Sequence, residues 1–280
     1  MTNFPTINGY RIACTTAGSS SNPPILLIHG LMSHRGVWTR TLETLKDHFF
    51  CVTFDLPGFG ESDKPRDGDY SIACQAERSV QVADHFGFGA FSVIGHSMGG
   101  QIATYMAASL APQRVSKLVS VDGVVTGKLS DRTETLNRLL VNVGKNIPAV
   151  YNLSYTLSKW KPYAQWAFKV WFNNPANLPF DSWELDRRMA MNPEISTSAY
   201  EAWGSLNATD LTHTLEKIAV PTLVIFGVQD DTVPVEQAHI FKEKAPAAQL
   251  VLIENCGHFP MYEKFDEYIA PVKEFLMKGR

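Results

Sequence analysis

Short runs of β-branched and aromatic residues recur along the chain, and each has the length of a strand. Runs of this kind, with no alternation of polar positions, are typical of strands that are buried on both faces of a parallel sheet. The opening segment, residues 7–16, is expected to form an antiparallel hairpin at the sheet edge. The runs that we interpret as buried strands span residues 25–29, 50–55, 91–95, 118–122, 222–226 and 249–253.

Segments with helical periodicity separate these strands. The predicted crossover helices span residues 37–46, 72–86, 99–111 and 235–245. Repeated alternation of strand and helix predicts an α/β fold, in which helices flank a mostly parallel central sheet.

The alternation stops between residues 122 and 222, where the sequence predicts helices only. We interpret residues 126–208 as a helical cap, or lid, inserted into a core domain that comprises residues 1–125 and 209–280. The predicted helices of this insertion span residues 131–143, 150–157, 162–171, 182–191 and 195–202.

Aromatic residues are dense in this insertion, which contains five of the six tryptophans. The rings either pack the insertion onto the core or line an apolar pocket. Lys159, Lys161 and Lys169 lie beside them, a pattern that also occurs at membrane interfaces. Such lysines are common on solvated helices, so we expect no stable membrane insertion. The candidate substrate-binding rings are Trp160, Trp166, Trp171 and Trp183.

The composition is that of a globular protein, with 45% hydrophobic and 19% charged residues in 280 positions. The net charge is −3, and acidic and basic residues are interspersed. A nucleic-acid partner is therefore not expected, because such proteins carry clustered basic residues. Composition gives no information on the oligomeric state.

The four cysteines are widely spaced and form no metal-binding or disulfide pattern, so we expect reduced, mostly buried thiols. The first residues lack a basic region followed by an apolar one, and no uninterrupted apolar stretch reaches the length of a membrane span. A cytoplasmic protein is the simplest expectation.

The strongest local motif is Gly95-His96-Ser97-Met98-Gly99-Gly100, which matches G-x-S-x-G. It lies directly between a predicted strand and a predicted helix, which is the context that a nucleophile elbow requires. Glycines flank the serine because the turn is too tight for side chains there. The motif predicts that Ser97 is a catalytic nucleophile.

A serine nucleophile needs a base, and an acid must orient that base. Asp230 follows the strand at 222–226, and His258 follows the strand at 249–253. In an open parallel sheet, functional residues lie beyond the carboxyl ends of strands, so Ser97, Asp230 and His258 are expected to form a catalytic triad. The backbone amides of Leu31 and Met98 are the candidate oxyanion-hole donors.

Other polar residues have simpler interpretations. His29 precedes Gly30 and is expected to order the loop rather than act as a second base. Asp55 ends a strand before a glycine-rich turn, where its carboxylate would accept hydrogen bonds from backbone amides. The eight histidines show no metal-ligand spacing, so neither a metal nor another cofactor is expected.

Taken along the chain, these motifs resemble the α/β-hydrolase superfamily of serine hydrolases, in a capped, esterase-like form. The resemblance implies a cap after the sixth strand of the sheet, and it favours Asp230 over Asp231 as the acid. Some members resembling this chain place the acid at the position of Asp122, which stays a rival. The residues that carry the resemblance are His29-Gly30, residues 55–62, Ser97 in its elbow, Gly227-x-x-Asp230 with Pro234, and Gly257-His258.

We therefore expect a cofactor-free carboxylesterase that cleaves small to medium apolar acyl esters, with lactones as further candidates. The same triad serves carbon–carbon bond hydrolases, perhydrolases, hydroxynitrile lyases and non-catalytic ligand receptors. His96 argues against carbon–carbon hydrolases, which often carry asparagine there. Ser97 argues against epoxide hydrolases and haloalkane dehalogenases, which need a carboxylate nucleophile.

Overall fold

The structure is a computed structural model that describes residues 2–147, 149–174, 176 and 184–278. At positions 137, 140, 186 and 187 it describes the backbone alone. The predicted helix 182–191 and the candidate ring Trp183 therefore lie partly or wholly outside the described residues.

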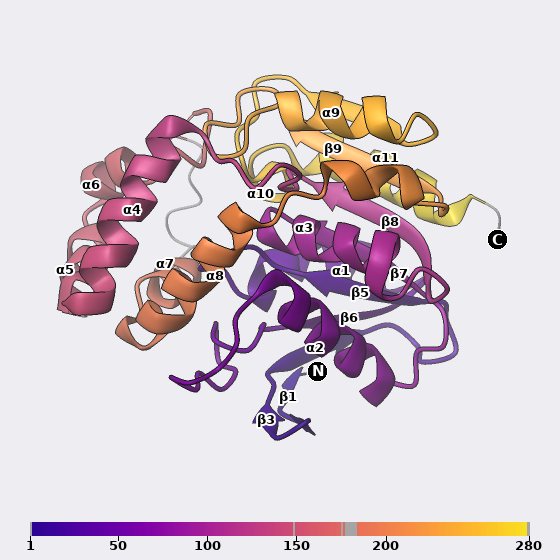
Figure 1. Ribbon diagram of the computed structural model, residues 1–280, viewed down its shortest axis with the longest axis horizontal. Helices are drawn as coiled ribbons and strands as arrows, with labels where there is room; N and C mark the ends of the chain where they lie inside the picture. The colour runs from indigo at the N-terminus through magenta and orange to yellow at the C-terminus, as the bar shows by residue number, and fades with distance from the viewer. Residues whose placement is uncertain (1, 148, 175, 177–183, 279–280) are drawn as a thin grey trace.

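An eight-stranded sheet forms the centre of the molecule (Figure 1). Its spatial order is β1-β4-β6-β5-β7-β8-β9-β10, and all neighbours from β6 to β10 are parallel. Strands β5, β6, β7 and β9 are almost wholly buried because their side chains are apolar on both faces, whereas the edge strand β10 is partly exposed. The strands are β1 (Thr2–Asn3), β4 (Cys14–Ala17), β5 (Pro24–Ile28), β6 (Phe50–Phe54), β7 (Phe91–His96), β8 (Val115–Val121), β9 (Thr222–Gly227) and β10 (Gln249–Ile253).

The opening segment supplies the antiparallel edge that the sequence predicted, although in two parts. β2 (Thr6–Ile7) and β3 (Tyr10–Arg11) form a small hairpin of their own. β4 instead joins the main sheet, antiparallel to β6, and β1 pairs with its outer side.

Helices cover the sheet, as the alternation predicted. α1 and α11 contact each other where the guanidinium of Arg40 lies 3.8 Å from the ring centre of Phe265. α2 packs against α3, and α9 packs against both outer strands β9 and β10. A π-helical turn, Met106–Leu110, extends α3. The core helices are α1 (Thr39–Leu45), α2 (Ile72–His85), α3 (Met98–Tyr105), α9 (Glu236–Lys244), α10 (Pro260–Glu263) and α11 (Phe265–Met277).

Five of the described α-helices follow β8, the sixth strand of the main sheet along the chain, and precede β9. Figure 1 shows them together at the end of the molecule opposite the C-terminus. None of the described helices combines the length and apolar character needed to cross a bilayer. The inserted helices are α4 (Asp131–Asn146), α5 (Ala149–Ser158), α6 (Lys161–Ala167), α7 (Glu184–Ala190) and α8 (Ser196–Ala208).

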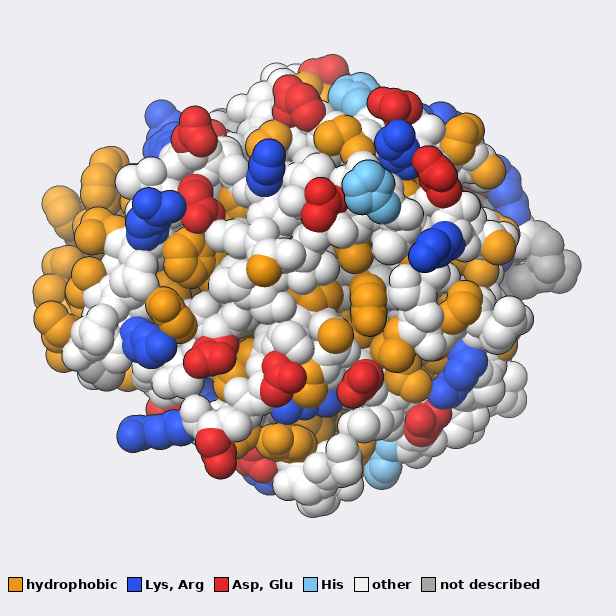
Figure 2. Space-filling view, viewed as in Figure 1, with side chains coloured by type: hydrophobic (Ala, Val, Ile, Leu, Met, Phe, Trp, Pro, Cys, Tyr) orange, Lys and Arg blue, Asp and Glu red, His pale blue; other side chains and the backbone are white. Residues whose placement is uncertain are grey.

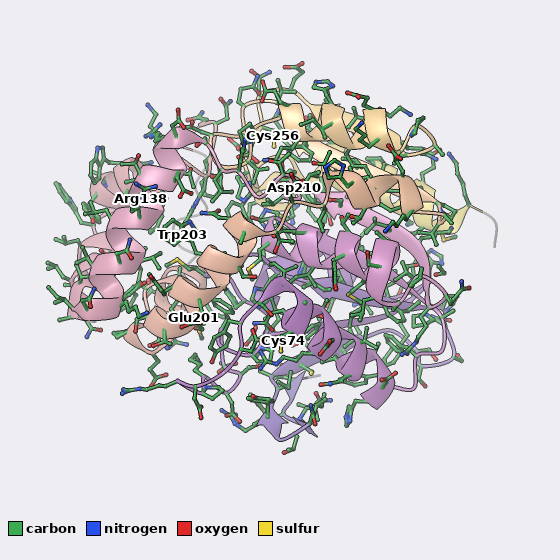
Figure 3. The ribbon with its side chains drawn as sticks, viewed as in Figure 1. Cys74, Arg138, Glu201, Trp203, Asp210 and Cys256 are labelled. Carbon is green, nitrogen blue, oxygen red and sulfur yellow. The ribbon has the colours of Figure 1, made fainter. Side chains whose placement is uncertain are left out.

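The cysteines are free thiols, as expected from their spacing. Figure 3 labels Cys74 on α2 and Cys256 in the loop that follows β10. Burial raises the pKa of Cys14 and that of Cys51 to about 12, so these thiols stay protonated. Their chemistry is that of small buried hydrophobic residues.

Candidate active site

Ser97 lies at the turn between β7 and α3, where the sequence predicts the nucleophile elbow. Its backbone has φ 56° and ψ −120°, a conformation that non-glycine residues rarely adopt. Strain of this kind persists only where the surrounding structure fixes it, and here it occurs at a residue that lines a cavity.

The glycines of the elbow are required by close backbone approach. A Cβ on Gly95 would lie 2.1 Å from the carbonyl oxygen of Gly99, and one on Gly99 would lie 2.3 Å from that of Ile28. A Cβ on Gly30 would lie 3.0 Å from the Cβ of Ser97. α3 can therefore begin against β5 and β7 only without these side chains.

His258 and Asp230 form a buried acid–base pair. His258 Nδ1 donates a hydrogen bond of 2.7 Å to Asp230 Oδ2. Asp230 Oδ1 accepts the backbone amides of Thr232 and Val233 at 2.7 and 3.0 Å. The turn after β9 thus fixes one carboxylate oxygen, and the other fixes the tautomer and orientation of the imidazole.

The loop that carries His258 is tied to its surroundings by backbone hydrogen bonds. The amide of His258 donates to the carbonyl of Trp171 at 2.9 Å, and that of Gly257 donates to Glu263 Oε2 at 2.8 Å. The Gln229 side chain accepts the amide of Cys256 at 3.1 Å, which joins the loops of Asp230 and His258. These bonds hold the imidazole in place.

Ser97 and His258 line the same cavity, which offers about 60 Å³ to water-sized molecules. Its wall is mostly apolar and combines residues of the core with residues of the inserted helices. The lining residues are Gly30, Leu31, Met32, Ser33, His34, His96, Ser97, Leu129, Thr133, Trp171, Ala190, Leu206, Thr232, His258 and Phe259. Two wider hollows, of about 530 and 640 Å³, contain neither residue of this pair, so volume alone does not identify the site.

The two predicted oxyanion donors lie beside Ser97. Leu31 lines the cavity and follows Gly30, the residue that approaches the Ser97 Cβ. Met98 is the first residue of α3, where backbone amides have no partner within the helix. Both residues therefore lie next to Ser97, Met98 along the chain and Leu31 in the wall of the shared cavity.

His29 has the structural role that its position predicted. Its Nδ1 donates to the carbonyl of Gly30 at 2.7 Å, because a carbonyl can only accept, and its Nε2 accepts the amide of Leu56 at 3.0 Å. Burial lowers the pKa of His29 to about 4. Both ring nitrogens are occupied, so the ring orders the loop before Leu31.

His96, which by sequence argued only against carbon–carbon bond hydrolases, contacts the loop of His258. Its Nε2 donates to the carbonyl of His258 at 2.7 Å, while Nδ1 has no hydrogen-bond partner among the described residues. Burial, followed by the nearby His258, lowers the pKa of His96 well below its usual value. Beyond the place of His96 next to Ser97, no signal in the sequence indicated this contact with His258.

Asp122, the rival acid, lies at the end of β8 with φ 43°. Its Oδ1 accepts the amide of Gly227 at 2.9 Å, whereas Oδ2 has no hydrogen-bond partner among the described residues. Burial, followed by the charge of Asp230, raises the pKa of Asp122 well above its usual range. The carboxylate that accepts the hydrogen bond of His258 belongs to Asp230, whereas the carboxyl of Asp122 accepts the amide of Gly227.

One group of three possible metal ligands occurs among the described residues: Asp122, Asp230 and His258, with ligand atoms within 4.8 Å of one another. The 2.7 Å hydrogen bond between His258 and Asp230 uses atoms that a metal ion would need. We therefore interpret this cluster as an acid–base pair.

The two remaining aspartates of the sequence analysis, Asp231 and Asp55, make contacts that hold the fold together. Asp231 is partly exposed, and its carboxylate pairs with Arg132 at 2.6 Å on α4. Asp55 is buried, pairs with Arg35, and accepts the amides of Arg35 and Glu61 at 2.6 and 2.7 Å. Asp55 thus satisfies backbone donors of the turn, as predicted.

The structure brings one of the described candidate tryptophans to the cavity. The predicted helix 162–171 ends at Ala167, so Trp171 leaves the helix and lies against Phe259, with ring centres 6.0 Å apart. Trp160 and Trp166 are 66% and 72% exposed and are not among the cavity residues, contrary to the expectation for them. The reason is helical register, because α6 turns Ala164 inward and Trp166 outward.

A strained serine elbow, a buried Asp–His pair and a cavity shared by the serine and the histidine define a hydrolase-type site on an α/β fold. The model of the α/β-hydrolase fold matches residues 23–265. The chain belongs to this family.

Relatives of the chain include esterases and lipases. An uncharacterised protein of Mycobacterium tuberculosis is 30% identical over 98% of this chain and 80% of its own. Lipase 1 of Psychrobacter immobilis is 27% identical over 96% of this chain and 81% of its own. The crystal structure of a bacterial membrane phospholipase A is 28% identical, with a TM-score of 0.79, over 99% of this chain and 85% of that one. The chain is thus a hydrolase of the esterase and lipase type.

Proposed function

We propose that this protein hydrolyses carboxylic esters of small to medium apolar acids through an acyl-enzyme intermediate on Ser97. The observation that carries the proposal is that Ser97 and His258 line one narrow cavity, while His258 donates a hydrogen bond to the buried carboxylate of Asp230. Lactones are cyclic esters and would react by the same steps.

In the first half-reaction, His258 Nε2 takes the proton of the Ser97 hydroxyl as its oxygen attacks the ester carbonyl carbon. The carbonyl electron pair moves onto oxygen, where the amides of Leu31 and Met98 stabilise the charge. The C–O bond to the alcohol then breaks, and His258 returns the proton to the departing alcohol oxygen.

In the second half-reaction, His258 takes a proton from a water molecule that attacks the acyl carbon. The bond to Ser97 breaks, the serine oxygen regains a proton from His258, and the free acid leaves. Asp230 stays ionised and stabilises the imidazolium that forms in both halves. Electron pairs and protons balance without a metal or another cofactor.

The residues that the insertion contributes to the cavity support its role as a cap. Residues 126–208 contribute Leu129, Thr133, Trp171, Ala190 and Leu206 to the cavity that Ser97 opens into. Of these residues, Leu129, Trp171, Ala190 and Leu206 are apolar and would select an apolar acyl group and exclude water from the acylation step.

The test is hydrolysis of p-nitrophenyl acetate, butyrate, octanoate and laurate by the purified protein, with and without EDTA. We expect highest kcat/KM for the shorter chains, no effect of EDTA, and a loss of several orders of magnitude in Ser97→Ala. A fluorophosphonate probe should label Ser97, identified by mass spectrometry of the labelled peptide.

Two outcomes would contradict the proposal. Labelling of Ser97 with no turnover of any ester or lactone, but cleavage of a vinylogous 1,5-diketone, would indicate a carbon–carbon bond hydrolase. Failure of the probe to label a folded protein, with no turnover of any substrate, would indicate a ligand receptor.

A further inference from the structure

Exposed apolar side chains are concentrated on the inserted helices. Nine large apolar side chains of the described residues are exposed, and seven of them lie between positions 139 and 185. Figure 2 shows hydrophobic side chains gathered at the end of the molecule where Figure 1 has α4, α5 and α6. We call the following group the apolar end: Leu139, Ile147, Leu153, Leu157, Trp160 and Trp166.

The helices hold these side chains outward through their register. α5 buries Tyr151 and Ser158, which leaves Leu153 and Leu157, four residues apart, on the opposite side. α6 buries Ala164 and likewise turns Trp166 to solvent. Each helix thus has a face packed on the protein and a second apolar face that nothing in the described structure covers.

The same segment carries a strongly asymmetric charge. Residues 135–180 contain five Lys and Arg residues and no Asp or Glu. The whole chain has a net charge of −3, so the remaining residues sum to −8. Lys159 and Lys161 flank Trp160 and are exposed, and Arg138 lies on α4 at the same end (Figure 3).

Exposed leucine and tryptophan next to lysine fit one kind of partner. Indole rings settle at the boundary between water and hydrocarbon, and lysine ammonium groups reach from there to anionic headgroups. Exposed apolar residues that gather on one part of a protein surface mark interaction sites. We propose that the apolar end docks onto the surface of an anionic lipid bilayer.

Two other partners fit less well. A second copy of this chain would bring Lys159 and Lys161 toward the same two lysines of the other copy, because a twofold interface pairs a patch with itself. Protein interfaces are also enriched in arginine and depleted in lysine, whereas this segment has four lysines and one arginine.

The test is co-sedimentation of the full chain with vesicles of ether-linked phosphatidylcholine, alone or with 30% ether-linked phosphatidylglycerol. Ether lipids contain no ester at the glycerol backbone, so binding is measured separately from the proposed activity. We expect stronger binding to the anionic vesicles, weakened in 0.5 M NaCl, and a blue shift of tryptophan emission on binding.

Matched variants separate the apolar and the charged contributions. Leu153→Gln with Leu157→Gln, 58% and 40% exposed, should weaken binding at least tenfold. The control is Phe4→Gln with Leu252→Gln, which are 44% and 37% exposed and lie outside the insertion.

Lys159→Gln with Lys161→Gln should weaken binding to anionic vesicles about fivefold per lysine, because each lysine near such a surface contributes about that much. Lys217→Gln with Lys273→Gln is the control.

Three results would overturn the proposal. They are no binding to either vesicle, binding that neither paired variant weakens more than its control, and a concentration-dependent dimer in light scattering that the leucine pair abolishes without vesicle binding. All variants replace exposed side chains, and an unchanged thermal midpoint establishes that each is folded.

Discussion

The imidazole of His96 donates a hydrogen bond of 2.7 Å from Nε2 to the backbone carbonyl oxygen of His258, and the two ring centres lie 4.7 Å apart. The residue before the proposed nucleophile thus holds the loop of the proposed base, although 162 positions separate them. This hydrogen bond connects the loop of Ser97 with the loop of His258, two segments that the inserted helices separate along the chain.

We predict that His96→Ala lowers kcat about tenfold or more, with a smaller change in KM. The reason is that loss of the bond to the His258 carbonyl loosens the base relative to Ser97, and small misplacement is costly in catalysis. His96→Asn keeps an N–H donor and should recover part of the rate. Equal kcat in the alanine variant and the wild type, measured with p-nitrophenyl butyrate, would show that the contact is only structural.

The two buried aspartates should respond differently to the same isosteric change. Asp230→Asn should lower kcat by about 10⁴, because the imidazole loses its tautomer and its charge partner. Asp122→Asn should stay within about tenfold, since Asp122 makes no hydrogen bond with the His258 ring and the side-chain oxygen of asparagine can still accept the amide of Gly227. Asp231→Asn is the surface control. If Asp122→Asn were as damaging as Asp230→Asn in a folded protein, the acid would be Asp122.

Acid should destabilise the fold through its buried histidines. Burial lowers the pKa of His29 to about 4, below the unfolded value of about 6.5. Between these two pH values the unfolded chain takes up a proton that the folded chain does not, so stability is lost as the pH falls through this window. His29 accounts for up to about 1.4 kcal/mol per pH unit, and His96, shifted in the same direction, adds to it.

The measurement is urea unfolding at several pH values between 7 and 4.5. In His29→Asn the slope of the unfolding free energy against pH should correspond to about one proton fewer, even though the variant is less stable at every pH. His213→Asn, which removes an exposed imidazole, is the control. An unaltered slope in His29→Asn would mean that this ring does not remain neutral in the fold.

Trp171 should influence substrate choice through its ring. It lines the cavity with Ser97, so Trp171→Leu should shift the preferred p-nitrophenyl ester toward longer acyl chains, at roughly 1 to 3 kcal/mol per methylene of pocket fit. Trp160→Leu and Trp166→Leu, with rings in solvent, are the matched controls. The same ratio of kcat/KM values across the ester series in all three variants would refute a selective role for Trp171.

Local sequence patterns determined the central sheet because its strands are buried on both faces. The six predicted strands agree with β5 to β10 within a few residues, since continuous apolar runs leave little choice of register. The C-terminal helix α11 was not predicted, and it contains Pro271, which ordinarily argues against a helix interior. Packing against β9 and β10 overrides that preference.

The sequence by itself determined the elbow of Ser97, because the glycines that permit its strained turn are adjacent in the chain. It also placed Asp230 and His258 after the right strands, since parallel strands end at one edge. Only the tertiary structure decided between Asp230 and its rival Asp122 as the hydrogen-bond partner of His258, and which of the described tryptophans faces the cavity. Helical periodicity fixes which residues share a face, whereas packing between helices decides which face is buried, and α6 turns Trp166 to solvent.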